Sequence, residues 1–129
     1  MQFTLVVSAA PEPALQPAQF AAALIAEGHS LKRVFFLREG VRHAEAGSAA
    51  AAAWLALPGA GQRFELAVCI GAAERRHVTP AFTHDNMQPQ LDPGVDGEQR
   101  RPRARFEVVG LGQLVDALVL ADRVVDFPG

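Results

Sequence analysis

The sequence predicts an α/β domain built on a mostly parallel, five-stranded sheet. Short apolar segments rich in β-branched residues alternate along the chain with segments in which apolar residues recur at helical spacing. This alternation is typical of a parallel sheet covered by helices on both faces, because each parallel connection needs a crossover. A chain of 129 residues that is 50% hydrophobic can bury one core, so we expect a single domain over residues 1–129.

Five segments are predicted to form the strands. Each is a short apolar run that ends at polar or turn-forming residues. The predicted strands are Gln2–Ser8, Arg33–Leu37, Phe64–Ile70, Phe106–Val109 and Arg123–Phe127. Because parallel strands place their carboxyl ends at one edge of the sheet, we expect ligands and chemistry at that edge.

Four helices are expected between these strands. The first begins at Pro17, whose missing N–H costs nothing in a first turn, and ends at Gly28, a residue type suited to a helix C-terminus. The second is alanine-rich and spans Val41 to Leu57, and a short third helix covers Gly71 to Arg76. The fourth carries apolar residues at positions i, i+3, i+4 and i+7, namely Leu111, Leu114, Val115 and Leu118.

The segment from Pro80 to Arg105 departs from this alternation. Its 26 residues contain four prolines and eight charged residues, with no clear hydrophobic period. Loops longer than about 12–15 residues are usually either functional or disordered. We therefore expect a long, solvated, Pro/Arg-rich loop at residues 80–105.

Charge and hydropathy narrow the classes of function. A formal net charge of −2 gives no general attraction to nucleic acid or to an anionic membrane. The longest apolar run, Ala49–Leu57, has nine residues, whereas a membrane-spanning helix needs about 20. No Lys or Arg precedes Lys32, although a secretory signal begins with positive charge. We expect a cytoplasmic protein that makes no direct contact with nucleic acid and none with a membrane.

Metal and nucleotide sites find little support in the sequence. The single cysteine excludes an internal disulfide, a thiolate zinc site and a CxxC redox pair. His29, His43 and His84 lack metal-ligand spacing, and we expect them to be ordinary surface residues. The Gly110–Gly112 turn lacks the third glycine of a dinucleotide-binding loop, where this chain has Val115. We therefore expect no metal and no cofactor.

Cys69 is the candidate nucleophile. It lies next to last in its predicted strand, at the edge where a helix is expected to begin. The free N–H groups of a helix start favour a thiolate, and Arg75 and Arg76 add positive charge nearby. The alternative is a small buried hydrophobic residue, which is the commoner role of a lone cysteine. His77 lies about 12 Å along the expected helix, too far to pair directly with the thiol.

Three segments together resemble the TusD/DsrE family of sulfur-relay proteins. They are Arg33–Val41 (RVFFLREGV), Val68–Val78 (VCIGAAERRHV) and Gly110–Phe127 (GLGQLVDALVLADRVVDF). The resemblance spans nearly the whole chain apart from the 80–105 segment. The sulfur-carrying cysteine of the family corresponds by position to Cys69, and the family usually has a small residue where this chain has His77.

The resemblance implies a flavodoxin-like, three-layer α/β fold and sulfurtransferase activity. Cys69 would take sulfane sulfur from a donor protein as a persulfide and pass it to an acceptor cysteine. The pathway would be tRNA 2-thiouridine synthesis or dissimilatory sulfur oxidation. Gly71, Arg75, Arg76 and Arg38 would form the supporting environment. The expected partners are related DsrF/DsrH or TusC/TusB-type subunits, with a homo-oligomer as the alternative when the chain is alone.

Two alternatives stay open from the residues alone. In the first, the chain is a non-catalytic scaffold subunit in which Cys69 is buried and inert. In the second, it is a flavodoxin-like cofactor binder, although the phosphate loop is missing. A single cysteine suits transfer between proteins, because no second thiol can discharge the persulfide as an internal disulfide.

Overall fold

A five-stranded sheet organises the chain, and its strands run in the order β4-β3-β2-β1-β5. The computed structural model describes residues 2–57, 64–81, 106–110, 112, 114, 118 and 122–129. Every strand pairing among these residues is parallel, which confirms the predicted fold class. The strands are β1 Gln2–Val7, β2 Ser30–Phe36, β3 Glu65–Cys69, β4 Phe106–Val109 and β5 Arg123–Phe127.

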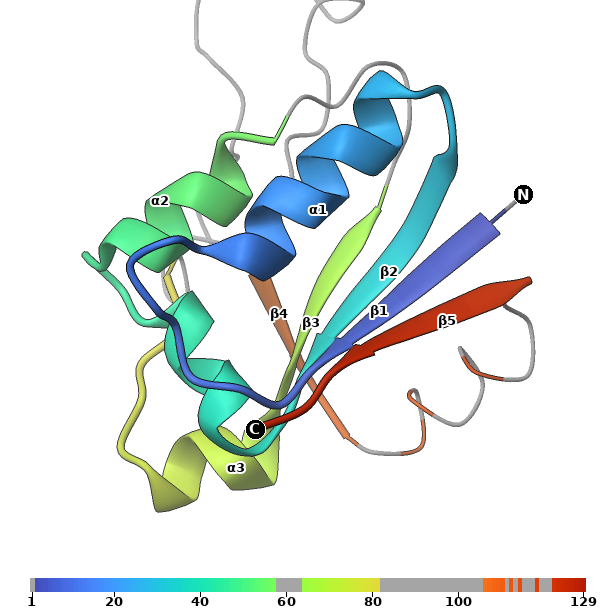
Figure 1. Ribbon diagram of the computed structural model, residues 1–129. Coiled ribbons are helices and arrows are strands. Elements are labelled where there is room, and N and C mark those ends of the chain that lie inside the picture. The colour runs from blue at the N-terminus through green and yellow to red at the C-terminus, as the bar shows by residue number, and fades with distance from the viewer. Residues whose placement is uncertain are drawn as a thin grey trace, which may run out of the picture.

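Four helical elements connect these strands within the described ranges: α1 Gln16–Ala26, the 3₁₀ helix η1 Arg38–Ala44, α2 Ala49–Leu55 and α3 Ile70–Arg75. Figure 1 shows α1 and α2 on one face of the sheet, with η1 and α3 beyond the carboxyl ends of the strands. Of the expected fourth helix, the described residues Gly112, Leu114 and Leu118 are helical. The connections therefore carry the helices that parallel strands require.

The continuous helix expected from Val41 to Leu57 is wrong. The chain forms the 3₁₀ helix η1 first, and α2 starts only at Ala49. Gly47 separates the two elements with a φ of +83°, a left-handed conformation that glycine adopts without strain. Ser48 then starts α2, because its Oγ accepts a hydrogen bond from the backbone N–H of Ala51 at 3.1 Å.

Apolar side chains pack on both faces of the sheet. On the face of α1 and α2, Trp54 packs edge-on against Phe36, with the ring centroids 5.1 Å apart. On the opposite face, Phe35, Ala67 and Val109 form a smaller cluster against which Leu114 packs. The sheet is therefore the middle layer of three, as the alternating pattern predicts.

The expected loop at 80–105 is described only at its first two residues. Pro80 and Ala81 are buried, and the N–H of Ala81 donates to the carbonyl of Ala44 at 2.7 Å. Residues 82–105 lie outside the described residues, so the expectation of a solvated loop there stays a prediction. Within the described ranges, no helix combines the length and hydropathy that crossing a membrane requires.

Candidate functional site

Cys69 is the last residue of β3, and α3 begins at the next residue. The pairing of Cys69 with Val109 on β4 and of Val68 with Phe36 on β2 places it at the carboxyl edge of the sheet. Its thiol is free and the residue is 8% exposed. Cys69 belongs to the main buried apolar cluster, whereas the adjacent Ile70 is 47% exposed.

The short helix α3 carries Cys69 at its N-cap position and ends in a left-handed residue. His77 has a φ of +55°, its N–H donates to Glu74 at 3.2 Å, and the N–H of Val78 donates to Ala73 at 2.9 Å. These two bonds form the Schellman motif that ends many helices, usually with glycine at the left-handed position. His77 therefore ends α3 at the opposite end from Cys69, in a conformation that favours a smaller residue.

Arg75 extends back along α3 toward Cys69. A Cβ atom added at Gly71 would lie 3.6 Å from Nη2 of Arg75, which places the guanidinium beside the first turn of the helix. Among the described residues, Arg75 forms no ion pair. Arg75 thus brings positive charge to the end of α3 where Cys69 is.

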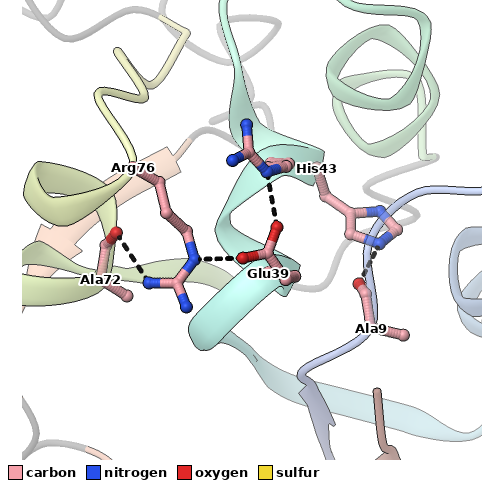
Figure 2. A network of polar contacts seen from close by, with 6 residues as sticks. Ala9, Glu39, His43, Ala72 and Arg76 are labelled. Atoms are coloured by element: carbon pink, nitrogen blue, oxygen red, sulfur yellow. Dashed lines mark hydrogen bonds and ion pairs between the residues drawn. The ribbon is translucent and has the colours of Figure 1, made fainter.

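Arg76 points to a different neighbour from Arg75. Its Nε donates to Glu39 Oε2 on η1 at 2.7 Å, and its Nη1 donates to the carbonyl of Ala72 at 3.3 Å (Figure 2). Glu39 Oε1 accepts a further bond from Nε of Arg42 at 2.7 Å. Hydrogen bonds from Arg42 and then Arg76 lower the pKa of Glu39, so the carboxylate stays ionised between its two arginines.

Arg38 lies at the start of η1, directly after β2. It is exposed and has a φ of +49°, which is uncommon for a residue with a side chain. The neighbouring backbone maintains this conformation, because the N–H of Leu37 donates to Val7 at 2.9 Å and that of Gly40 donates to Leu37 at 2.7 Å. The two strands β2 and β3 are adjacent, so Arg38 and Cys69 leave the sheet at neighbouring positions.

Gly40 is required by the same junction. A Cβ atom at this position would overlap the backbone carbonyl of Val7. The REGV part of the sequence therefore has a structural explanation: Glu39 binds two arginines, Gly40 allows η1 to contact β1, and Val41 is fully buried. The REGV motif could have identified Glu39 as a candidate residue, but it could not identify the partner Arg76, which lies 37 residues away.

The expectation that His43 is a surface residue is wrong, because it is 1% exposed. Trp54 Nε1 donates to His43 Nδ1 at 3.1 Å. The other ring nitrogen, Nε2, lies 3.1 Å from the carbonyl of Ala9, as Figure 2 shows. Since Nδ1 accepts, Nε2 carries the proton and donates to Ala9. Burial lowers the pKa of His43, which keeps the ring neutral. Nothing local in the sequence indicated this burial, since these partners lie 11 and 34 residues away.

Apart from Arg75, the described side chains near Cys69 differ in where they point. Among the described residues, no group of three His, Cys, Asp or Glu side chains could hold a metal ion. The structure brings Arg75 and Gly71 to the Cys69 end of α3 and places Arg38 at the neighbouring strand end. The guanidinium of Arg76 instead binds Glu39. The candidate site therefore consists of one thiol at the carboxyl edge of the sheet, with the guanidinium of Arg75 beside the first turn of α3.

Comparison with known proteins gives the same result along almost the whole chain. The sequence model of the DsrE/DsrF-like family matches residues 1–127. Sulfurtransferase TusD of Cronobacter sakazakii is 38% identical over 98% of this chain and 100% of its own length. Sulfurtransferase TusD of Pectobacterium carotovorum is 40% identical over 84% of this chain and 83% of its own. These matches confirm the resemblance found in the sequence.

A solved structure supports the fold independently. The crystal structure of the YchN protein from E. coli superimposes with a TM-score of 0.63. The alignment covers 98% of this chain and 100% of that one at 20% sequence identity. At that identity the likeness concerns the fold alone.

Proposed function

Because the chain belongs to the DsrE/DsrF-like family, we propose that it is a sulfurtransferase subunit that carries sulfane sulfur as a persulfide on Cys69. The observation that carries the proposal is the place of the chain's one cysteine. Cys69 ends β3 at the carboxyl edge of the sheet with 8% of the residue exposed, in a chain that aligns over nearly its full length with a sulfurtransferase.

The transfer needs one thiol and no cofactor. The Cys69 thiolate attacks the outer sulfur of a donor persulfide, the S–S bond of the donor breaks, and the donor leaves as a thiolate. The terminal sulfur keeps its proton, so Cys69 becomes a persulfide. In the second step an acceptor thiolate attacks that terminal sulfur and releases the Cys69 thiolate. Sulfane sulfur moves in both steps with no net oxidation or reduction.

The residues around Cys69 have separate roles in this proposal. Arg75 stabilises the anionic sulfur electrostatically, with its guanidinium beside Gly71 in the first turn of α3. Arg38 forms the rim of the site at the end of β2. Arg76 acts on the site only through the position of α3, because Glu39 and Ala72 engage its guanidinium.

The relay requires a donor protein and an acceptor protein. The relatives named TusD favour tRNA 2-thiouridine synthesis in the cytoplasm over dissimilatory sulfur oxidation as the pathway. We also infer that the single domain over residues 1–129 assembles with TusC/TusB-type or DsrF/DsrH-type subunits, or with copies of itself when alone. Ile70, Val108, Leu118 and Val124 are each at least 40% exposed, and burying any of them at an interface would stabilise such an assembly.

Sulfur loading tests the proposal. The protein is incubated with glutathione persulfide, and the intact mass is then measured without reductant. We expect a gain of about 32 Da for each sulfur that forms a persulfide, with the modification on Cys69 and absent from Cys69→Ser. A gain that persists in the serine variant would place the sulfur elsewhere.

The second candidate function is that of a scaffold subunit with an inert cysteine. The observation that favours it is the 8% exposure of Cys69 in the single chain. The same experiment separates the two functions, because an inert thiol stays at its unmodified mass in the wild-type protein.

A further inference from the structure

The carboxylate of Glu39 joins the two elements that follow β2 and β3. Its Oε1 accepts from Arg42 Nε and its Oε2 accepts from Arg76 Nε, each at 2.7 Å (Figure 2). Arg42 lies on η1 with Glu39, whereas Arg76 lies at the end of α3. The two oxygens of one side chain thus connect the 3₁₀ helix to the helix that begins beside Cys69.

The η1 side of this connection is fixed to the sheet. Gly40 contacts the carbonyl of Val7 too closely for any side chain, and the N–H of Leu37 donates to the same carbonyl at 2.9 Å. Val41 and Ala44 are fully buried. The backbone that carries Glu39 is therefore anchored to the end of β1.

The α3 side depends on contacts for its position. The helix has six residues, and helices this short are unstable in isolation. Ala72 and Ala73 bury its inner face, and backbone hydrogen bonds join residues 79–81, which follow the helix, to residues 44–46. Within the described part of the chain, no side-chain hydrogen bond other than Arg76 to Glu39 joins α3 to η1. The same guanidinium also donates to the carbonyl of Ala72, so it links Glu39 to the middle of α3.

We propose that Glu39 is a positioning residue for Cys69, acting through Arg76 to hold α3 in place. The inference rests on the proposed role of Cys69 as the sulfur carrier. With α3 held, the guanidinium of Arg75 stays beside the first turn of the helix, directly after Cys69. With α3 released, this guanidinium moves relative to β3, and the Cys69 thiolate loses part of its electrostatic stabilisation.

The sign of the effect separates positioning from simple charge. Removing the negative Glu39 would favour the Cys69 thiolate if the two groups interacted only through space, and removing the positive Arg76 would disfavour it. Positioning predicts the same direction for both, because either change breaks the same bond. It also predicts that the double variant adds nothing to the larger single effect.

The experiment measures the rate at which iodoacetamide alkylates Cys69 between pH 5 and pH 10. It compares the wild type with Glu39→Ala, Arg76→Ala and the double variant. We expect each single variant to raise the pH of half-maximal rate by roughly 0.3–1 unit, with the double variant no higher than the larger single one. The amide oxygen of Glu39→Gln can still accept a hydrogen bond from Arg76, so the shift in this variant should be less than half of that in Glu39→Ala.

The matched control is Glu65→Ala. It removes the ion pair between Glu65 and Arg33 at the other end of β3, and it should leave the alkylation profile unchanged. Shifts of opposite sign in the two single variants, additive shifts, or an equal shift in Glu65→Ala would overturn the positioning role. Thermal unfolding of each variant identifies any that fail to fold. If Glu39→Ala is one of them, the alkylation profile of Glu39→Gln tests the positioning role in its place.

Sulfur loading of the wild type in the same preparations distinguishes this inference from the proposed function. A wild type that stays unloaded by glutathione persulfide contradicts the proposed function, whatever the alkylation profiles are. A wild type that loads normally, together with profiles of opposite sign, contradicts the positioning role alone.

Discussion

The chain leaves the carboxyl edge of the sheet in contrasting ways after β2 and after β3. After β2 it enters η1, where Gly40 contacts the backbone of β1, Glu39 binds two arginines and His43 is buried with both ring nitrogens bonded. After β3 it enters α3, a six-residue helix with no side-chain cap at its start and a left-handed histidine after its end.

The two junctions differ in how many of their side chains are bonded to others. In the η1 junction the side chains of Glu39, Arg42 and His43 are bonded and the backbone packs closely, so the junction has little freedom to move. The α3 junction leaves Cys69 without a side-chain partner among the described residues, beside an arginine that has no ion pair there. In the proposed function this thiol carries the sulfur, and in the proposed positioning role the adjacent junction is the rigid element against which α3 is held.

The largest expected effect is at Gly40, in the rigid junction. Gly40→Ala places a Cβ against the backbone of Val7, which cannot give way without moving β1. We expect a loss of about 3 kcal/mol in the free energy of unfolding, measured by urea denaturation. Gly110→Ala is the control, because a Cβ there meets open space, and its change should be within about 0.5 kcal/mol. Equal losses in both would mean that η1 does not contact β1 closely.

His43 provides the second test of the rigid junction. His43→Phe keeps a ring of similar size but leaves the N–H of the buried Trp54 without an acceptor. We expect a loss of about 2 kcal/mol in the free energy of unfolding at pH 7, measured by urea denaturation. A loss no larger than that of an exposed substitution would contradict the buried hydrogen bond.

The pH dependence of folding gives a third prediction. Burial lowers the pKa of His43, so the unfolded chain binds a proton at pH values where the folded chain does not. The resulting stabilisation is complete above the ordinary histidine pKa of about 6.5. It is lost as the pH falls through that value toward the lower folded-state pKa. Urea denaturation at pH 7 and pH 5 should show a smaller decrease for His43→Phe than for the wild type, and His77→Asn should behave like the wild type.

A smaller effect should separate the two arginines of the α3 junction. Arg75→Gln removes the charge beside the first turn, and it should slow sulfur loading from glutathione persulfide by about two- to fivefold at pH 7 without changing the thermal midpoint. Arg76→Gln should lower the thermal midpoint, because it weakens the bond to Glu39. Stopped loading reactions followed by mass spectrometry, together with thermal unfolding, measure both. Equal loading rates and equal thermal midpoints in the two variants would contradict separate roles for Arg75 and Arg76.

The smallest effect should be at the end of α3. His77→Gly relieves a left-handed conformation, so it should stabilise the fold by about 0.5–1 kcal/mol in urea denaturation. Gly28 ends α1 with the same pair of backbone bonds at a φ of +84°, and Gly28→Ala should destabilise by a similar amount. A glycine at position 77 that lowers stability would mean that the His77 side chain contributes to packing.

Much of this arrangement could be predicted from the sequence, and the exceptions have physical causes. The strand positions followed from apolar runs, and the place of Cys69 at a strand end followed from the start of a helical segment after it. The break between η1 and α2 was missed, although Gly47 and Ser48 were local signals for it. The burial of His43 and the different directions of Arg75 and Arg76 depend on partners distant in the sequence, which no local pattern reveals.

Discharge of a loaded protein tests the central claim most directly. Wild-type protein is loaded with glutathione persulfide, separated from excess donor and mixed with a cysteine thiol as the acceptor. We predict that one added sulfur per chain, located on Cys69 by peptide mass spectrometry, disappears from the protein while an equal amount of acceptor persulfide forms. A protein that loses no sulfur to the acceptor, or that carries its sulfur on a peptide without Cys69, would contradict the account.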